Sequence, residues 1–323
     1  MKRRNLLAMS AGLAATSLPF ARRSFAVTRT VGWISVEPPA TIAPFLAAFK
    51  AGLLAARGGD QVRVVDRNVT TGADGVAAAV DDLQRQGVSL LVAQGAATPI
   101  VARLKPSLPV VFGFSGDPVV AGIVRSLARP GGNFTGMTFM SVELNAKRID
   151  LLRAALPDCR RLGLLSNSMH PGEENEIAAC QRAVQPAGIA LHTYRVKGAA
   201  EVQSAVTRAL DDGIHALIAL PSSTMVRHSA SISAQCLARR VPVASGWASM
   251  ARDGALLTYG PNLAEAYKRV AQYAMRVLGG AKPSDLPVEQ PSVLELVINM
   301  KIAAALGLRL PPSLLAQANE VVE

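Results

Sequence analysis

Small polar residues stand where several apolar runs of this sequence end, and their types and spacing suit ligand binding. Ser35 ends one such run, Gln94 and Gly95 end another, and Ser222 and Ser223 follow a third. Hydroxyls, amides and the backbone N–H groups of helix starts can bind a ligand without reacting with it. These residues therefore predict a binding site rather than a catalytic centre.

The sequence lacks the patterns that accompany enzymatic chemistry. It has no P-loop, and no GxGxxG motif follows an apolar run. The segment Gly113-Phe-Ser-Gly-Asp117 approaches the GxSxG nucleophile elbow, but Asp117 replaces the final glycine and no triad partner is identifiable. We therefore predict a non-enzymatic protein with no catalytic residue, and an enzyme on the same scaffold is the weaker alternative.

No metal ion or cofactor is expected. The four histidines are dispersed, and the three cysteines lack the spacing of metal ligands. We expect the cysteines to be buried free thiols, although one pair could form in an oxidising compartment. They are Cys159, Cys180 and Cys236.

The candidate binding residues depend on elements that alternate along the chain. Short, nearly continuous apolar runs are typical of parallel strands buried on both faces, and the longer stretches between them have helical periodicity. This alternation predicts an α/β fold of doubly wound, Rossmann-like sheets. The expected strands are Val31–Val36, Val62–Val69, Leu90–Gln94, Val110–Phe114, Leu162–Ser166, Leu191–Val196, Ala216–Leu220 and Val241–Ala244. The expected helices include Pro44–Ala56, Gly75–Gln86, Leu144–Leu156, Glu174–Val184 and Ala199–Leu210.

The same design occurs twice along the chain, which predicts two similar lobes. Three segments of the first half match three segments of the second half in the same order. Each match ends at the carboxyl end of a strand, where open α/β sheets place their ligand loops, so the lobes should enclose one cleft. The matched segments are Thr30–Ser35 with Arg161–Ser166, Gly87–Thr98 with Gly213–Thr224, and Pro109–Phe114 with Pro242–Trp247.

The net charge of +11 first suggests a nucleic-acid partner. However, residues 1–26 hold five basic residues and no acid, and no nucleic-acid-binding motif is present, so we expect no such partner. These residues predict an export signal, with a basic start at Lys2-Arg3-Arg4, a charge-free stretch Leu6–Phe20 and a small-x-small cleavage site Ser24–Ala26. Arg3-Arg4 resembles a twin-arginine signal. An uncleaved anchor is the weaker alternative, because a spanning helix needs about 20 apolar residues.

Several stretches, spread over almost all of residues 27–323, carry a family resemblance. The most distinctive are Leu127-Ala-Arg-Pro-Gly-Gly-Asn-Phe-Thr-Gly136 and Glu295-Leu-Val-Ile-Asn299. The others are Val31–Ser35, Ile42–Phe49, Asp117–Val124, Ala146–Leu152, Leu257–Gly260, Pro283–Val288 and Pro311–Leu315. In these stretches the sequence resembles the substrate-binding proteins of ABC transporters, of the tryptophan/tyrosine-type family.

That resemblance implies the type I periplasmic binding protein fold, in which two α/β lobes joined by crossing strands close on a ligand. Lobe 1 would comprise residues 27–138 plus 261–284, and lobe 2 residues 139–260 plus 285–323. The hinge is expected near residues 135–138, 259–262 and 283–287.

On lobe 1, the candidate ligand contacts lie on loops that follow strands. Ser35 could bond a ligand carboxylate or cap a turn, and the N–H groups of the loop from Gln94 to Thr98 suit an anionic group. By the resemblance, Asp117 lines the cleft and could pair with a ligand ammonium, but Asp before Pro is also an ordinary helix cap. The lobe 1 candidates are Ser35, Gln94, Gly95, Thr98, Phe114, Ser115 and Asp117.

On lobe 2, the equivalent loops supply the other half of the expected site. Asn167 could bond the ligand carboxylate or form an Asx turn. Phe114 and Trp247 occupy matched positions and could hold an apolar side chain between them, or simply pack in the core. The lobe 2 candidates are Asn167, Ser222, Ser223, Gly246 and Trp247.

The sequence thus predicts a monomeric periplasmic protein that captures a small solute, an amino acid or a related small carboxylate. It would deliver this solute to an ABC permease in the inner membrane, which works with its ATPase. The alternative is a periplasmic sensor that presents its liganded form to a receptor kinase, because both roles use lobe closure.

Overall fold

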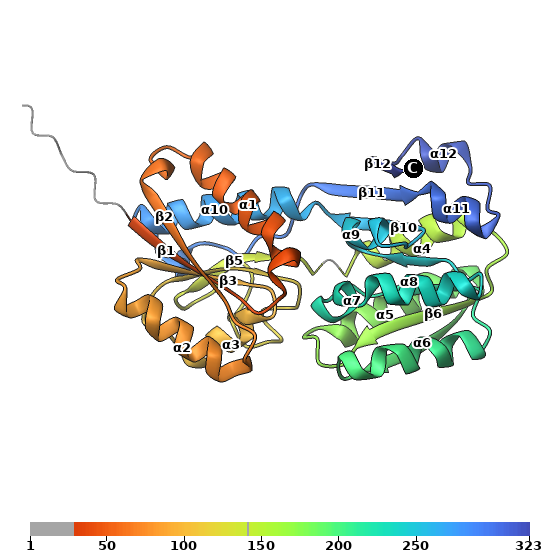
Figure 1. Ribbon diagram of the computed structural model, residues 1–323, viewed down its shortest axis with the longest axis horizontal. Coiled ribbons are helices and arrows are strands. Elements are labelled where there is room, and N and C mark those ends of the chain that lie inside the picture. The colour runs from red at the N-terminus through yellow and green to blue at the C-terminus, as the bar shows by residue number, and fades with distance from the viewer. Residues whose placement is uncertain (1–28, 141) are drawn as a thin grey trace, which may run out of the picture.

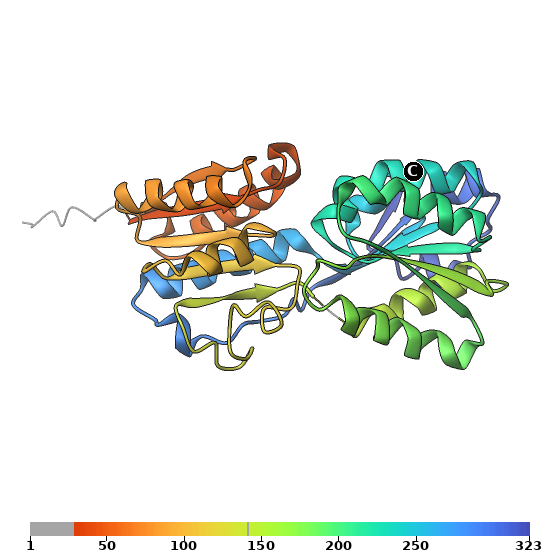
Figure 2. The ribbon, with the colours of Figure 1, turned by 90° about the horizontal axis from the view of Figure 1, so that it is seen from below.

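Two α/β lobes lie side by side in the computed structural model, which describes residues 29–140 and 142–323 (Figure 1). Each lobe has a central sheet with helices on both faces (Figure 2). The expected export signal, residues 1–26, lies outside the described residues. No helix among the described residues is long and apolar enough to cross a membrane.

Lobe 1 contains a fully parallel sheet in the order β2-β1-β3-β4-β5. Val31 and Trp33 pack with one pair of helices, α1 and α10, whereas Ile34 packs with α2 and α3 on the opposite face. The strands are β1 (Arg29–Ser35), β2 (Val62–Asn68), β3 (Leu90–Gln94), β4 (Val110–Phe114) and β5 (Phe134–Thr138). The helices are α1 (Pro39–Ala55), α2 (Gly72–Arg85), α3 (Ala97–Leu104) and α10 (Leu263–Leu278).

Lobe 2 contains a seven-stranded sheet in the order β12-β11-β10-β9-β8-β6-β7, in which only β10 and β11 pair antiparallel among the described strands. Its strands are β6 (Arg161–Asn167), β7 (Ala190–Val196), β8 (Ala216–Ala219), β9 (Val243–Ser245), β10 (Leu257–Pro261), β11 (Leu294–Asn299) and β12 (Glu320–Val322). Its helices are α4 (Leu144–Ala155), α5 (Glu173–Val184), α6 (Val202–Asp211), α7 (Ser223–Arg227), α8 (Ser229–Ala238), α9 (Ala248–Arg252), α11 (Met300–Leu306) and α12 (Pro312–Leu315). The helices α4 and α5 share one apolar core, and α6 and α8 share another.

The two lobes repeat one strand order. The strands β1 to β5 run in the order 2-1-3-4-5, and β6 to β10 follow the same order within lobe 2. The prediction of a two-lobed α/β fold is therefore confirmed, and β11 and β12 extend the second sheet. The three cysteines are buried and free, as expected.

The chain passes between the lobes three times. The first two passages lie between β5 and α4 and between β10 and α10. The third lies later than the expected 283–287, because Val288 N donates to Leu127 O and Glu289 N donates to Gly136 O, both in lobe 1. Residues 286–289 thus run along lobe 1, and the chain crosses over residues 290–293 to reach β11.

Candidate functional site: the cleft between the lobes

The lobes touch along the edges where their parallel strands end. Ser115 Oγ, after β4, lies 3.2 Å from His170 Nε2, after β6. Asp117 N donates to Pro171 O over 2.9 Å. At a second point, Arg227 Nη2 donates to Glu37 Oε2 over 2.6 Å. These contacts join the carboxyl-end loops of the two sheets, and the lobes are closed on each other.

A pocket of about 130 Å³ lies at this junction and has walls from both lobes. Five of the sequence candidates line it: Phe114, Ser115, Asn167, Ser222 and Ser223. The remaining lining residues are Ala96, Pro99, Met169, His170, Pro171 and Thr224. The loops that the internal repeat pairs across the lobes therefore meet in one place.

Two lobe 1 candidates use their hydroxyl groups within the lobe. Ser35 is fully buried, and its Oγ accepts a hydrogen bond from Asn68 Nδ2. Thr98 is also fully buried, and its Oγ1 donates to Ala93 O, so the hydroxyl ties the start of α3 to the end of β3. The structure places both side chains under the cleft surface and not in the pocket.

Gln94 and Gly95 lie at the end of β3, next to the cleft. The buried Gln94 Oε1 has no hydrogen-bond partner among the described residues. Gly95 has a φ of +55°, a left-handed conformation that favours glycine, and a Cβ built on it would lie 3.9 Å from Ser223 Oγ of lobe 2. The backbone of Gly95 is thus close to the opposite lobe.

Asp117 and Asn167 both make local caps. Asp117 Oδ1 accepts from Val119 N and Val120 N, while its own N–H is bonded to lobe 2. Asn167 Oδ1 accepts from Met169 N, and its Nδ2 donates to Thr224 Oγ1. Both side chains therefore make the capping hydrogen bonds that the sequence offers as an alternative to ligand binding. Both residues also lie where the two lobes meet.

The other lobe 2 candidates differ in their surroundings. Ser222 Oγ accepts from Met225 N and caps α7. Trp247 is almost fully buried, and its Nε1 has no acceptor among the described residues. Gly246 lies against Arg148, since a Cβ built on it would be 2.6 Å from Arg148 Nη2.

A cluster of buried ionisable groups lies behind the lobe 2 loops. Ser166 Oγ donates to Glu173 Oε1 over 2.5 Å, and His170 Nδ1 lies 3.9 Å from Glu176 Oε2. Burial raises the pKa of Glu176 to about 7, although the nearby positive charge of Arg148 opposes this shift. Burial lowers the pKa of His170 to about 4. Both groups are therefore held mainly neutral in the slightly acidic range.

Lobe 1 holds an aromatic cluster at the corresponding depth. The ring of Tyr267 on α10 packs against Trp33, Phe45 and Phe139 with centroid separations between 5.1 and 5.7 Å. Tyr267 is fully buried beside Gln94, and burial raises the pKa of its hydroxyl. The sequence does not single out Tyr267, Arg148 or Glu176, because an aromatic or a charge inside a helical pattern carries no motif.

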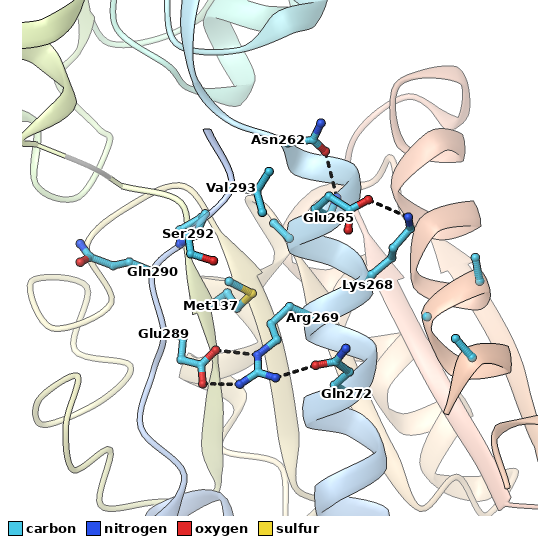
Figure 3. Close-up of a pocket in the computed structure, with 15 residues that line it drawn as sticks. Met137, Asn262, Glu265, Lys268, Arg269, Gln272, Glu289, Gln290, Ser292 and Val293 are labelled. Atoms are coloured by element: carbon cyan, nitrogen blue, oxygen red, sulfur yellow. Dashed lines mark hydrogen bonds and ion pairs between the residues drawn. The ribbon is translucent and has the colours of Figure 1, made fainter. Parts of the chain in front are cut away.

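A larger pocket of about 480 Å³ lies elsewhere, on lobe 1 beside the third passage (Figure 3). Its charged groups are paired with one another. Arg269 forms two hydrogen bonds of 2.7 Å with Glu289, and Lys268 Nζ donates to Glu265. Because these charges already have partners and the pocket has no lobe 2 loop in its wall, the smaller pocket between the lobes is the better candidate. No cluster of three metal-ligating side chains occurs in residues 29–140 and 142–323.

The decisive comparison is with a family model described as ABC transporter substrate binding protein, which matches residues 46–322. The chain belongs to this family. The matched region spans both lobes of this substrate-binding protein.

Individual relatives share its fold at low identity. A tyrosine-binding protein of Clostridioides difficile is 22% identical over 203 residues, which are 62% of this chain and 58% of the relative. The chain thus spans less than two thirds of that relative's length. An ABC domain from Streptococcus pneumonia in complex with L-Trp has a TM-score of 0.83 at 24% identity and covers 91% of this chain and 100% of its own. The ligand-free, open form of a substrate-binding protein with adhesive properties from Clostridium difficile has a TM-score of 0.70 at 18% identity. The match covers 91% of this chain and 99% of that protein's chain.

Proposed function

We propose that this substrate-binding protein works in the periplasm, where it captures an amino acid between its lobes and delivers it to an ABC permease driven by its ATPase. The observation that carries the proposal is the pocket lined by Phe114 and Ser115 of one lobe and by Asn167, Ser222 and Ser223 of the other. The names of two relatives, which refer to tyrosine and L-Trp, support an amino-acid ligand.

Ligand binding is proposed to favour the closed arrangement of the lobes. A ligand shifts such an equilibrium only if it contacts the closed state better than the open one. A solute that touches Phe114 on one side and Asn167 on the other satisfies this condition, because the contacts from both lobes exist together only when the lobes meet. The contacts between Ser115 and His170 and between Glu37 and Arg227 would form in the same step.

The candidate contacts fall into two groups under this proposal. Residues that line the pocket, together with Gln94, Gly95, Gly246 and Trp247 beside it, would contact the ligand directly. Ser35, Thr98 and Asp117 would act by holding the cleft loops, since their side chains already bond within the protein.

A thermal-shift screen of residues 27–323 tests the binding role. L-tryptophan, L-tyrosine and the other amino acids are compared with small organic acids, nucleosides and sugars. An amino acid at 100 times its dissociation constant should add about 2.7 kcal/mol to the free energy of unfolding. Stabilisation by sugars or nucleosides alone would contradict the proposal. Delivery is tested by uptake of the labelled amino acid in cells that lack this chain, which should fall and recover on complementation.

A further inference from the structure

Arg148 of α4 is a buried cation without a buried anion in contact with it. Its side chain is 2% exposed. Its Nε donates to Tyr259 O over 2.7 Å and its Nη1 to Asn145 Oδ1 over 2.6 Å, and both acceptors are neutral. Among the described residues, no acceptor bonds Nη2, and no carboxylate oxygen lies within 4.0 Å of the guanidinium. Buried charges in proteins are normally paired, because desolvation is costly.

The nearest acidic group compensates this charge only in part. Glu176 of α5 acts on Arg148 through space but lies beyond ion-pair distance. At neutral pH a large fraction of Glu176 is protonated, since burial raises its pKa to about 7. Asn145 Nδ2 has no acceptor within 3.5 Å among the described residues, although its amide lies close enough to Glu176 to lower the pKa of that carboxyl. Arg148 Nη2 and Asn145 Nδ2 are therefore neighbouring donors that make no hydrogen bond within 3.5 Å among the described residues.

Arg148 lies behind the loop that follows β9 in lobe 2. Its Nη2 would lie 2.6 Å from a Cβ on Gly246, which directly follows β9 at the edge facing lobe 1. In lobe 1 the internal repeat places Gly113 at the matched position, and a Cβ there would lie 2.8 Å from the ring of Tyr267. In each lobe, a glycine at a strand end therefore leaves room for one large polar side chain. This side chain is Tyr267 of α10 in lobe 1 and Arg148 of α4 in lobe 2, and each helix follows a passage of the chain between the lobes.

We propose that Arg148, together with Asn145, binds the carboxylate of the ligand in the cleft between the lobes. A guanidinium presents its N–H groups in a plane that matches a carboxylate, and the amide N–H₂ of Asn145 adds a donor beside it. That the ligand is an amino acid rests on the proposed function. The assignment of Arg148 as the group that binds the carboxylate is separate from the proposed function, because any small carboxylic acid would need the same partner.

The test compares matched acids and amides on wild type and Arg148→Gln by calorimetric titration. The pairs are L-tryptophan with L-tryptophanamide, L-tyrosine with L-tyrosinamide, and phenylacetate with phenylacetamide. In wild type, the acid of any pair that binds should bind about 100-fold more tightly than its amide. In Arg148→Gln the acid should lose this advantage while the amide keeps its wild-type affinity, which also shows that the variant is folded.

Two further variants make the result independent of folding defects. Lys147→Gln removes an exposed positive charge one residue away and should leave the preference for acids unchanged. Asn145→Asp places a carboxylate beside the guanidinium and should suppress acid binding about as strongly as Arg148→Gln, while it stabilises the ligand-free protein.

Each outcome separates this inference from the proposed function. If phenylacetate binds through Arg148 and no amino acid binds, the amino-acid proposal fails and the role of Arg148 stands. If amino acids bind and Arg148→Gln keeps the acid preference, the role of Arg148 is wrong and the proposed function stands. If wild type binds none of these acids and none of the amino acids of the thermal-shift screen, both are wrong.

Discussion

Single residues behind the cleft of lobe 2 are held in unusual ionisation states. His170 contacts Ser115 of lobe 1 through Nε2, and its Nδ1 lies 3.9 Å from Glu176. Burial acts on the two groups in opposite directions, because it disfavours the imidazolium of one and the carboxylate of the other. Between about pH 4.5 and 6.5 the folded protein keeps a proton on Glu176, whereas the unfolded chain keeps one on His170. Their effects on the pH dependence of stability therefore cancel.

Removal of either group should expose the effect of the other. In His170→Asn, the raised pKa of Glu176 remains, so the free energy of unfolding should fall as pH rises from about 4.5 to 7. In Glu176→Gln, the lowered pKa of His170 remains, so the free energy of unfolding should rise as pH rises from about 4 to 6.5. Each slope should approach 1.4 kcal/mol per pH unit relative to wild type.

Urea unfolding at half-unit steps between pH 4.5 and 7 measures both slopes. The two variants serve as controls for each other, because a general loss of stability would shift both curves without giving slopes of opposite sign. Parallel curves for the two variants would show that these pKa shifts are absent.

Sequence reasoning reached the cleft loops but not this cluster, for a physical reason. Serine, asparagine and glycine after an apolar strand are visible as a pattern, since strand ends are where open α/β sheets place loops. Arg148 and Glu176 lie within helices, where a charge every few residues normally faces solvent. Their burial results from the packing of α4 against α5 and β10, which the sequence does not reveal locally.

At the scale of elements, the short helix α7 brings a charge across the cleft. Ser222 caps α7, and Arg227 at the other end of the helix pairs with Glu37, just before α1. Glu37 is 4% exposed, whereas Arg227 is about half exposed. The pair thus joins the lobes only in the closed state and leaves Glu37 buried there.

Arg227→Ala should weaken ligand binding without direct contact with the ligand. In the closed form, the variant would bury the Glu37 carboxylate without its cation, which disfavours closure. We expect the dissociation constant of the bound amino acid to rise about 10-fold to 100-fold, mainly through faster dissociation. Stopped-flow kinetics measure the dissociation rate, and calorimetric titration measures the dissociation constant.

Arg239→Ala is the matched control, because Arg239 pairs with Asp211 at 2.9 Å entirely within lobe 2. The affinity of Arg239→Ala for the amino acid should equal that of wild type. If both variants bind as wild type does, the pair between the lobes plays no part in closure.

The elements themselves were predicted unevenly. Strands such as β3 are continuously apolar and were located from the sequence, but Phe134–Thr138 and Leu257–Pro261 contain glycine, threonine or proline and lack that pattern. Helix α1 begins at Pro39 and not at the expected Pro44, because a proline fits the first helical turn, where its missing N–H has no partner. The third passage lies later than the sequence predicts. Residues 286–289 are held on lobe 1 by backbone hydrogen bonds, by the buried side chains of Leu286 and Val288 and by the ion pair of Glu289 with Arg269, and these contacts follow no sequence pattern.

The whole molecule consists of two lobes of the same strand order, and its proposed function requires them to close on a solute. One approach of the two lobes that suits a covalent link lies between Gly95 and Ser223, where a Cβ on Gly95 would lie 3.9 Å from Ser223 Oγ. Across a disulfide the Cβ of one cysteine lies about 3 Å from the sulfur of the other, so the bond requires the two loops to approach by about 1 Å. The left-handed φ of Gly95 adds some strain to a cysteine at this position. The native cysteines are buried, so they should not compete for this bond.

The most direct test is therefore to trap the lobes with the double substitution Gly95→Cys and Ser223→Cys. The reduced protein should still bind the amino acid found by the thermal-shift screen, although more weakly than wild type, because Ser223 lines the pocket and Gly95 lies beside it. The protein oxidised without ligand should not bind it, and the protein oxidised with ligand should retain it through desalting until a reductant is added, as mass spectrometry would show. If the empty oxidised protein binds the amino acid as fast and as tightly as the reduced protein, the ligand does not lie between the lobes.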